Sequence, residues 1–215
     1  MISTCRRSWF PVLLASGVLV CTLMSCGSKQ GATKSNFKAA IQAELDKQPV
    51  CIITTLPYDV PGWNGQLKTD GNMEALVRAG LVKRTQMMVA GSPMDAMLED
   101  TRPKTVPGYR YEAAEPAKKY LIEIHNPMGA STELCYGKKK VDEVVRFTEP
   151  ASVTGMTASQ VTYTWELTDI ADWARNPDVE THFHTDQFLD AADSPRQAQM
   201  ELVLSNDGWH FQSGF

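Results

Sequence analysis

The sequence has few of the features that mark an enzyme or a nucleic-acid-binding protein. It contains only four histidines among 215 residues. It also lacks the Gly-x-Ser-x-Gly nucleophile elbow, a phosphate-binding glycine loop and the His-Glu-x-x-His zinc motif. Its formal net charge is −4, which argues against nucleic-acid binding, since that function needs a basic surface. The composition therefore favours a protein without a cofactor and without the chemistry that these motifs perform.

A long uninterrupted apolar run is also missing. The stretch from Trp9 to Met24 is mostly apolar, but a proline and a glycine break it. A transmembrane helix needs about 20 apolar residues. Two arginines precede the stretch, which is the order of the charged and apolar regions of an export signal. We therefore expect residues 1–25 to be a signal peptide and the small, polar residues 26–35 to be a flexible tether.

The residues Leu23-Met24-Ser25-Cys26 resemble the lipobox of bacterial lipoproteins. The resemblance implies that the Cys26 thiol receives a diacylglycerol, that the chain is cut before Cys26, and that the new amino group is acylated. Several acyl chains, at about 0.8 kcal/mol per buried methylene, hold a protein on a bilayer. Gly27 is not the aspartate that resembles an inner-membrane retention signal. We therefore expect attachment to the outer membrane, facing the periplasm; the alternatives are an uncleaved anchor and ordinary cleavage nearby.

Cysteine is scarce in the part that would remain after cleavage. Removal of residues 1–25 leaves 190 residues, takes the formal charge to −6 and leaves Cys51 and Cys135 beside the lipidated Cys26. Two thiols in an oxidising compartment favour a disulfide. The alternative is two buried free thiols that behave as small hydrophobic side chains.

Periodicity predicts short helices and antiparallel strands after the tether. Helices are expected near residues 36–45, 72–79 and 171–175. Strands are expected near residues 50–53, 109–111, 120–124, 141–147, 161–167 and 199–204. Between residues 85 and 108 the pattern weakens, and we expect an excursion from the core there. Asn206-Asp207-Gly208 predicts a hairpin turn, because glycine readily adopts positive φ.

Two details of this pattern are specific enough to test. In the strand near residues 161–167, the odd-numbered side chains are apolar and the even-numbered ones are polar, which predicts a half-buried strand. In the strand near residues 141–147, we expect Val141, Val145 and Phe147 to share the buried face.

Strands that follow strands, with short helices among them, indicate an α+β fold. We expect an antiparallel C-terminal sheet with short helices in residues 131–215. Residues 36–130 are expected to form a small, partly helical α+β unit before it. The sequence alone does not distinguish one intimately packed domain from two.

Part of the first unit resembles a winged-helix-like unit. The segment from Ala75 to Val82, followed by Tyr109 to Glu112 and Lys118 to Tyr120, is similar to its helix, first strand and returning strand. Residues 85–108 would then be a long wing. In an acidic exported protein the resemblance implies a packing or protein-contact module, not a DNA reader.

A wider resemblance is carried by four stretches: Cys135 to Lys139, Thr148 to Pro150, Trp173 to Pro177 and Leu202 to Trp209. Together they resemble a family of uncharacterised proteobacterial envelope lipoproteins, over most of residues 36–213. The resemblance implies an envelope location but no activity and no site residues.

Two histidines form the best candidate for a metal site. His182 and His184 flank one residue, and Asp186 follows nearby. On a strand, the two imidazoles would share a face and could hold a divalent metal with Asp186. If the segment is helical, the histidines point about 200° apart. A small metal-dependent hydrolase that uses these three residues is the alternative function.

Four methionines lie within eleven residues: Met87, Met88, Met94 and Met97. Methionine is common on adaptable protein-contact surfaces, and thioether ligation of copper is the alternative. With the nearby aromatic Tyr109, they form the candidate partner surface. The favoured function is therefore a non-enzymatic, membrane-anchored accessory module that binds another envelope protein. Self-association is a third hypothesis.

Overall fold

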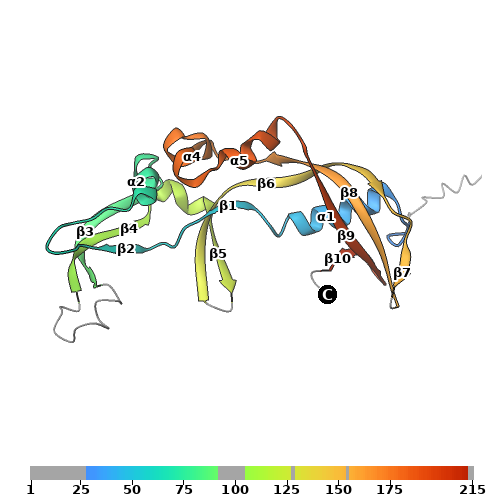
Figure 1. The fold of residues 1–215 in the computed structure, drawn as a ribbon, viewed down its shortest axis with the longest axis horizontal. Helices are drawn as coiled ribbons and strands as arrows, with labels where there is room; N and C mark the ends of the chain where they lie inside the picture. Colours follow the sequence, from blue (N-terminus) through green and yellow to red (C-terminus); the bar gives the residue numbers. More distant parts are fainter. Residues whose placement is uncertain (1–27, 92–104, 127–128, 154, 213–215) are drawn as a thin grey trace, which may run out of the picture.

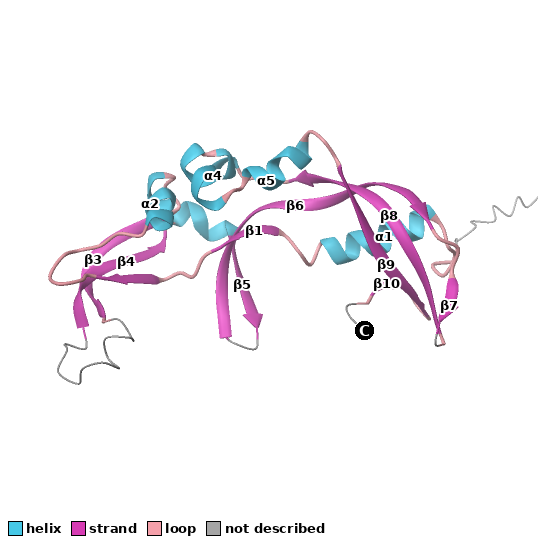
Figure 2. Cartoon of the chain, in the orientation of Figure 1, coloured by secondary structure: helices cyan, strands magenta, loops and turns pink. Residues whose placement is uncertain are grey.

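Antiparallel strands and short helices build the chain, as expected for an α+β fold. The structure is a computed structural model that describes residues 28–91, 105–126, 129–153 and 155–212. Seven strands form one sheet and three strands form another. Figures 1 and 2 show these sheets in an elongated arch, with α1 (Lys34–Leu45) toward one end and β3 (Val82–Ala90) at the other. Within the described ranges, no helix is long and apolar enough to cross a membrane.

The remaining elements follow in chain order. The larger sheet consists of β1 (Val50–Ile53), β5 (Leu121–Asn126), β6 (Gly129–Phe147), β7 (Ala151–Val153), β8 (Met156–Thr168), β9 (Arg196–Ser205) and β10 (Gly208–Phe211). The smaller sheet consists of β2 (Tyr58–Pro61), β3 and β4 (Thr105–Ala113). The other helical elements are α2 (Gly71–Arg78), η1 (Glu115–Tyr120), η2 (Asp172–Arg175), α4 (Pro177–Phe183), α5 (Asp186–Leu189) and η3 (Asp190–Ala192).

Helix α1 packs on the sheet formed by the second half of the chain. It contacts β6, β9 and β10. The side chain of Phe37 is fully buried, and its ring lies 4.8 Å from the rings of both Phe147 and Trp209. Ile41, one turn further along the helix, is fully buried as well. The apolar stripe expected from the sequence is therefore present, and it covers strands distant in sequence.

The boundary expected between residues 130 and 131 falls inside β6. Strands β1 and β5 pair with the first part of β6, and β8 pairs with its later part. Because one 19-residue strand carries both sets of pairings, the larger sheet is continuous across the expected boundary.

Capping residues set the starts of helices α1 and α2. The Thr33 hydroxyl caps α1 by accepting a hydrogen bond from the Asn36 backbone N–H at 3.2 Å, so the helix begins earlier than the residue 36 expected from the sequence. Asp70 is the N-cap of helix α2, and its carboxylate accepts a bond from the Met73 N–H at 3.0 Å. Gly80, with φ of +73°, follows its C-terminus, in the left-handed conformation that glycine favours.

The buried face predicted for the strand over residues 141–147 is wrong. The registry between β6 and β8 shifts between Val141 and Val144 and again before Arg146. Such bulges insert an extra residue and change which side chains face the core. As a result Val141 and Val144 are buried, whereas Val145 is 41% exposed.

The expected buried apolar face of β8 and the C-terminal hairpin are confirmed, although Thr162 on the polar face of β8 is buried as well. Val161, Tyr163, Trp165 and Leu167 are all buried. Strands β9 and β10 pair antiparallel, and Gly208 begins β10 with φ of +132°. Trp209 is buried and donates its indole N–H to the carbonyl oxygens of Gln30 and Gly31, both at 3.2 Å. The start of the described chain is thereby attached to the last strand.

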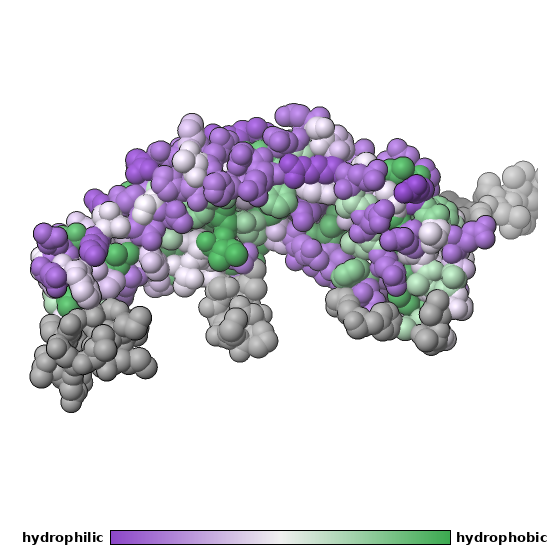
Figure 3. Space-filling view, in the orientation of Figure 1, coloured by the Kyte–Doolittle hydropathy of each residue, from purple (hydrophilic) through white to green (hydrophobic). Residues whose placement is uncertain are grey.

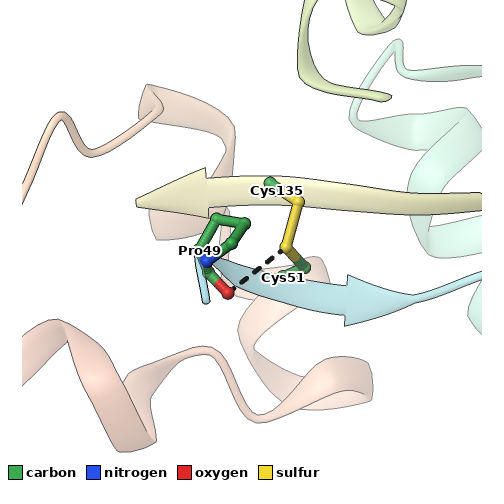
Figure 4. The surroundings of a disulfide bond; sticks show 3 residues. All are labelled: Pro49, Cys51 and Cys135. Atoms are coloured by element: carbon green, nitrogen blue, oxygen red, sulfur yellow. Dashed lines mark hydrogen bonds between the residues drawn. A yellow bond between two sulfur atoms is a disulfide. The ribbon is translucent and has the colours of Figure 1, made fainter. Parts of the chain in front are cut away.

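The predicted disulfide is present. Cys51 on β1 and Cys135 on β6 lie directly opposite each other and are joined by an S–S bond of 2.04 Å (Figure 4). The Cys51 Sγ also lies 3.5 Å from the carbonyl oxygen of Pro49. The bond fastens β1, an edge strand of four residues, to the longest strand of the larger sheet.

Candidate interaction surface

The smaller sheet and α2 form a unit that we call the arm (residues 58–61, 71–78, 82–90 and 105–113). Figure 1 shows it at the end of the arch opposite α1. Among the residues that the structure describes, its strand order is β2-β4-β3, so β4 is central and β3 is an edge strand. The expected excursion from the core over residues 85–108 needs correction, because β3 continues to Ala90 and β4 begins at Thr105. The six consecutive residues from Lys83 to Met88 are exposed, and this is why no alternation of apolar residues marks the strand.

A hydrogen-bonded group around a buried tyrosine fixes α2 to the sheet. The Tyr111 side chain is fully buried, and its hydroxyl donates to Glu74 Oε1 at 2.7 Å. Arg84 on β3 donates to the same oxygen at 2.8 Å. Burial of the ring, followed by the bond to Glu74, raises the pKa of Tyr111 to about 12. These contacts connect α2, β3 and β4 into one unit.

A second set of charged contacts connects β2 to β4. Arg110 donates two hydrogen bonds to the Asp59 carboxylate, each of 2.8 Å. This bidentate bond lowers the pKa of Asp59 below its usual value, against the opposing effect of burial. Elsewhere on the arm, the Arg84 guanidinium lies 4.7 Å from the centre of the Tyr109 ring, which is a cation–π distance. Arg84 therefore covers part of the ring of Tyr109, the aromatic residue of the predicted partner surface.

The structure divides the predicted partner surface between two faces. Met88 is opposite Pro107, and Gln86 is opposite Tyr109, so Met88 and Tyr109 share a face. Met87 is opposite Gly108 and points to the other face. Met87 is 38% exposed and Met88 is 54% exposed. Figure 3 shows hydrophobic side chains among polar ones on the arm. Met94 and Met97 lie outside the described residues.

The backbone of β3 has one side turned away from the sheet. Leu81 O accepts a bond from Ala114 N, and Gly62 N donates to Pro107 O, both at 2.9 Å. In an antiparallel ladder, hydrogen-bonded pairs alternate along each strand. Hence the odd-numbered residues of β3 bond to β4, and the N–H and C=O groups of its even-numbered residues point outward. Sequence reasoning missed this edge, because no side-chain pattern reports it.

No family model, curated protein or solved structure matches the chain.

The metal hypothesis based on three residues of the C-terminal half is wrong for the described structure. His182 lies near the end of α4, and its Nδ1 is 2.9 Å from the carbonyl oxygen of Asp178. His184 takes a left-handed conformation directly after α4, and Asp186 starts the separate helix α5. The part of the chain that the structure describes contains no group of three His, Cys, Asp or Glu side chains able to hold a metal ion. The physical reason is that the segment is helical and not a strand, so the alternation that would place both imidazoles on one face is absent.

A groove of about 380 Å³ lies between α1 and β10. Its lining includes the small side chains of Ala39, Ala40 and Ala43. Four of the charged or polar lining residues contact one another in pairs. Lys47 Nζ lies 2.9 Å from Glu44 Oε2, and His210 Nε2 lies 2.9 Å from Asp207 Oδ1. The groove thus presents small apolar groups between paired polar ones, and the arm is the stronger candidate for function.

Proposed function

We propose that the chain is a lipid-anchored protein of the bacterial cell envelope that acts as a non-enzymatic protein-binding module. In this proposal Cys26, which lies outside the described residues, carries the lipid. The support for it is the Leu23-Met24-Ser25-Cys26 pattern after an apolar, export-signal-like segment. The outer membrane is the proposed site of attachment, with the folded part in the periplasm.

The open edge of the arm is the observation that carries the binding function. Met87 and Met88 are exposed on opposite faces of β3, and between them the outer side of the strand presents backbone donors and acceptors. Exposed methionines suit adaptable contacts with protein surfaces. An exposed strand edge is a template for another strand. A protein segment seated on this edge would contact both methionines, whereas a ligand on one face would contact only one.

We also propose that the arm works as a winged-helix-like contact unit. Helix α2 is followed by the antiparallel hairpin of β3 and β4, and β2 completes the sheet in the order β2-β4-β3. The acidic charge of the whole chain supports protein contact over DNA contact.

Photocrosslinking in intact cells tests the binding function. A photoreactive amino acid at Met88 of the tagged full chain should give a crosslinked adduct with a protein. The matched control places the same residue at Val145 on β6, which is 41% exposed and lies outside the arm. Equal crosslinking from both positions, or none from Met88, would refute the arm as the binding surface.

The anchor has a separate test. The Cys26→Ala variant should leave the membrane fraction after a salt wash, whereas Cys21→Ala, in the apolar segment before the proposed cleavage site, should remain there. Retention of the Cys26→Ala variant in washed membranes would refute lipidation at Cys26.

A further inference from the structure

The two edges of the arm are unequal as templates for another strand. Strand β2 has four residues, and its outward backbone positions are Asp59 and Pro61, because Val60 bonds toward β4. Proline has no N–H to donate, and short edge strands with proline resist pairing. Strand β3 has nine residues and no proline. A pairing strand therefore fits β3 and not β2.

We propose that two copies of this chain pair through β3, antiparallel, about a two-fold axis at Gln86. The proposal deepens the proposed function and rests on it, because it identifies the protein bound by the arm as a second copy. The outward residues are Val82, Arg84, Gln86, Met88 and Ala90, and Gln86 is their centre. A two-fold axis at this residue engages every outward backbone group of both strands.

The other symmetric registers are poorer. An axis at Arg84 would place two arginines directly opposite each other, and like charges in that position are destabilising. It would also leave Met88 and Ala90 beyond the end of the second strand. An axis at Met88 would leave Val82 and Arg84 beyond the end of the second strand. An axis at Thr85 would leave Ala90 beyond that end, and an axis at Met87 would leave Val82 beyond it. Only the axis at Gln86 pairs the complete strand.

The side chains agree with this register. Arg84 lies opposite Met88 of the second copy, and Lys83 lies opposite Val89 of the second copy. Thr85 lies opposite Met87 of the second copy, so each exposed methionine gains a neighbour on its own face. No like charges therefore lie directly opposite each other in this register, and Val89 keeps its side chain buried in its own arm. Attachment of both copies to one membrane would raise their effective concentration.

A cysteine at the proposed axis provides the direct test. Residues of a hydrogen-bonded antiparallel pair have Cα atoms about 5.5 Å apart, which lies within the range for a disulfide. In cells that make the full chain, Gln86→Cys should give a disulfide-linked dimer that reductant removes. Val145→Cys, at a residue that is also exposed, is the control and should give none.

Two neighbouring proline variants distinguish pairing from folding. Gln86→Pro removes an outward N–H, so it should abolish the dimer of the detergent-solubilised full chain in sedimentation. At a protein concentration low enough for the wild type to be a monomer, the thermal midpoint of Gln86→Pro should match that of the wild type. Thr85→Pro removes an N–H that bonds to β4 and should lower the thermal midpoint. If Gln86→Pro sediments as a dimer, or Gln86→Cys gives no disulfide, the self-pairing is refuted.

The photocrosslink from Met88 separates this inference from the proposed function. An adduct with the mass of two chains supports both. An adduct with a different protein, and no Gln86→Cys dimer, refutes self-pairing and leaves the binding function standing. The absence of any adduct refutes both.

Discussion

Removal of the Cys51–Cys135 disulfide measures how much of the stability depends on one cross-link between β1 and β6. The bond joins residues 84 positions apart. In the chain-entropy treatment, closing a loop of this length restricts the unfolded chain enough to contribute about 4.6 kcal/mol. We therefore expect the Cys51→Ala/Cys135→Ala variant to lose about that free energy of unfolding, a large share of the roughly 5–15 kcal/mol of a typical domain.

The assay is urea unfolding of the full chain in detergent, followed by tryptophan fluorescence. Reduced wild-type protein is the control, because it loses the cross-link and keeps both side chains. The far-ultraviolet circular dichroism of the folded variant should match the wild type, since the effect acts mainly on the unfolded chain.

The two possible failures have different meanings. A loss below about 1 kcal/mol in both proteins would refute the loop-closure argument. A loss in the alanine variant alone would mean that side-chain packing around Cys51 and Cys135 is responsible.

Three other perturbations test the packing and the charged contacts. Phe37→Ala should lower the free energy of unfolding by about 3–5 kcal/mol in the same urea assay, because it empties a fully buried aromatic site between α1 and the sheet. Acid titration of stability should show a loss below about pH 3.9, as Asp59 is protonated and its bonds to Arg110 fail. Asp59→Asn should reduce that slope. Between about pH 10 and the raised pKa of about 12, Tyr111 should stay protonated in the folded chain while an unfolded tyrosine ionises. Stability should therefore fall over this interval, and Tyr111→Phe should reduce the fall.

Each of these has its own contradicting result. Val145→Ala is the exposed control for Phe37, and similar losses from the two would mean that α1 is not held by its apolar stripe. An unchanged acid slope in Asp59→Asn would exclude the ion pair as its cause. A phenolate signal at pH 10 that disappears in folded Tyr111→Phe would show that Tyr111 is accessible to solvent.

Much of the local structure could be read from short stretches of sequence. The Asp70 cap and Gly80 bound α2, the alternation around Tyr163 specifies the buried face of β8, and Gly208 permits the C-terminal turn. These features follow from interactions among residues close together along the chain, so spacing and residue type are sufficient to predict them. The same reasoning predicted an α+β fold.

The pairing of distant segments could not be read in this way. Whether Cys51 meets Cys135 and which sheet receives Phe37 depend on packing across the whole chain. The buried face of β6 changes at bulges that the apolar pattern around Val145 does not reveal.

The same division applies to the candidate interaction surface. The sequence by itself determined the export-signal pattern ending at Cys26, the acidic charge and the presence of the methionines. Only the tertiary structure decided that Met87 and Met88 face opposite ways on an edge strand and that the backbone of Gln86 points outward. The physical reason is that a strand becomes an edge through the absence of a neighbouring strand, and that absence is a property of the assembled sheet.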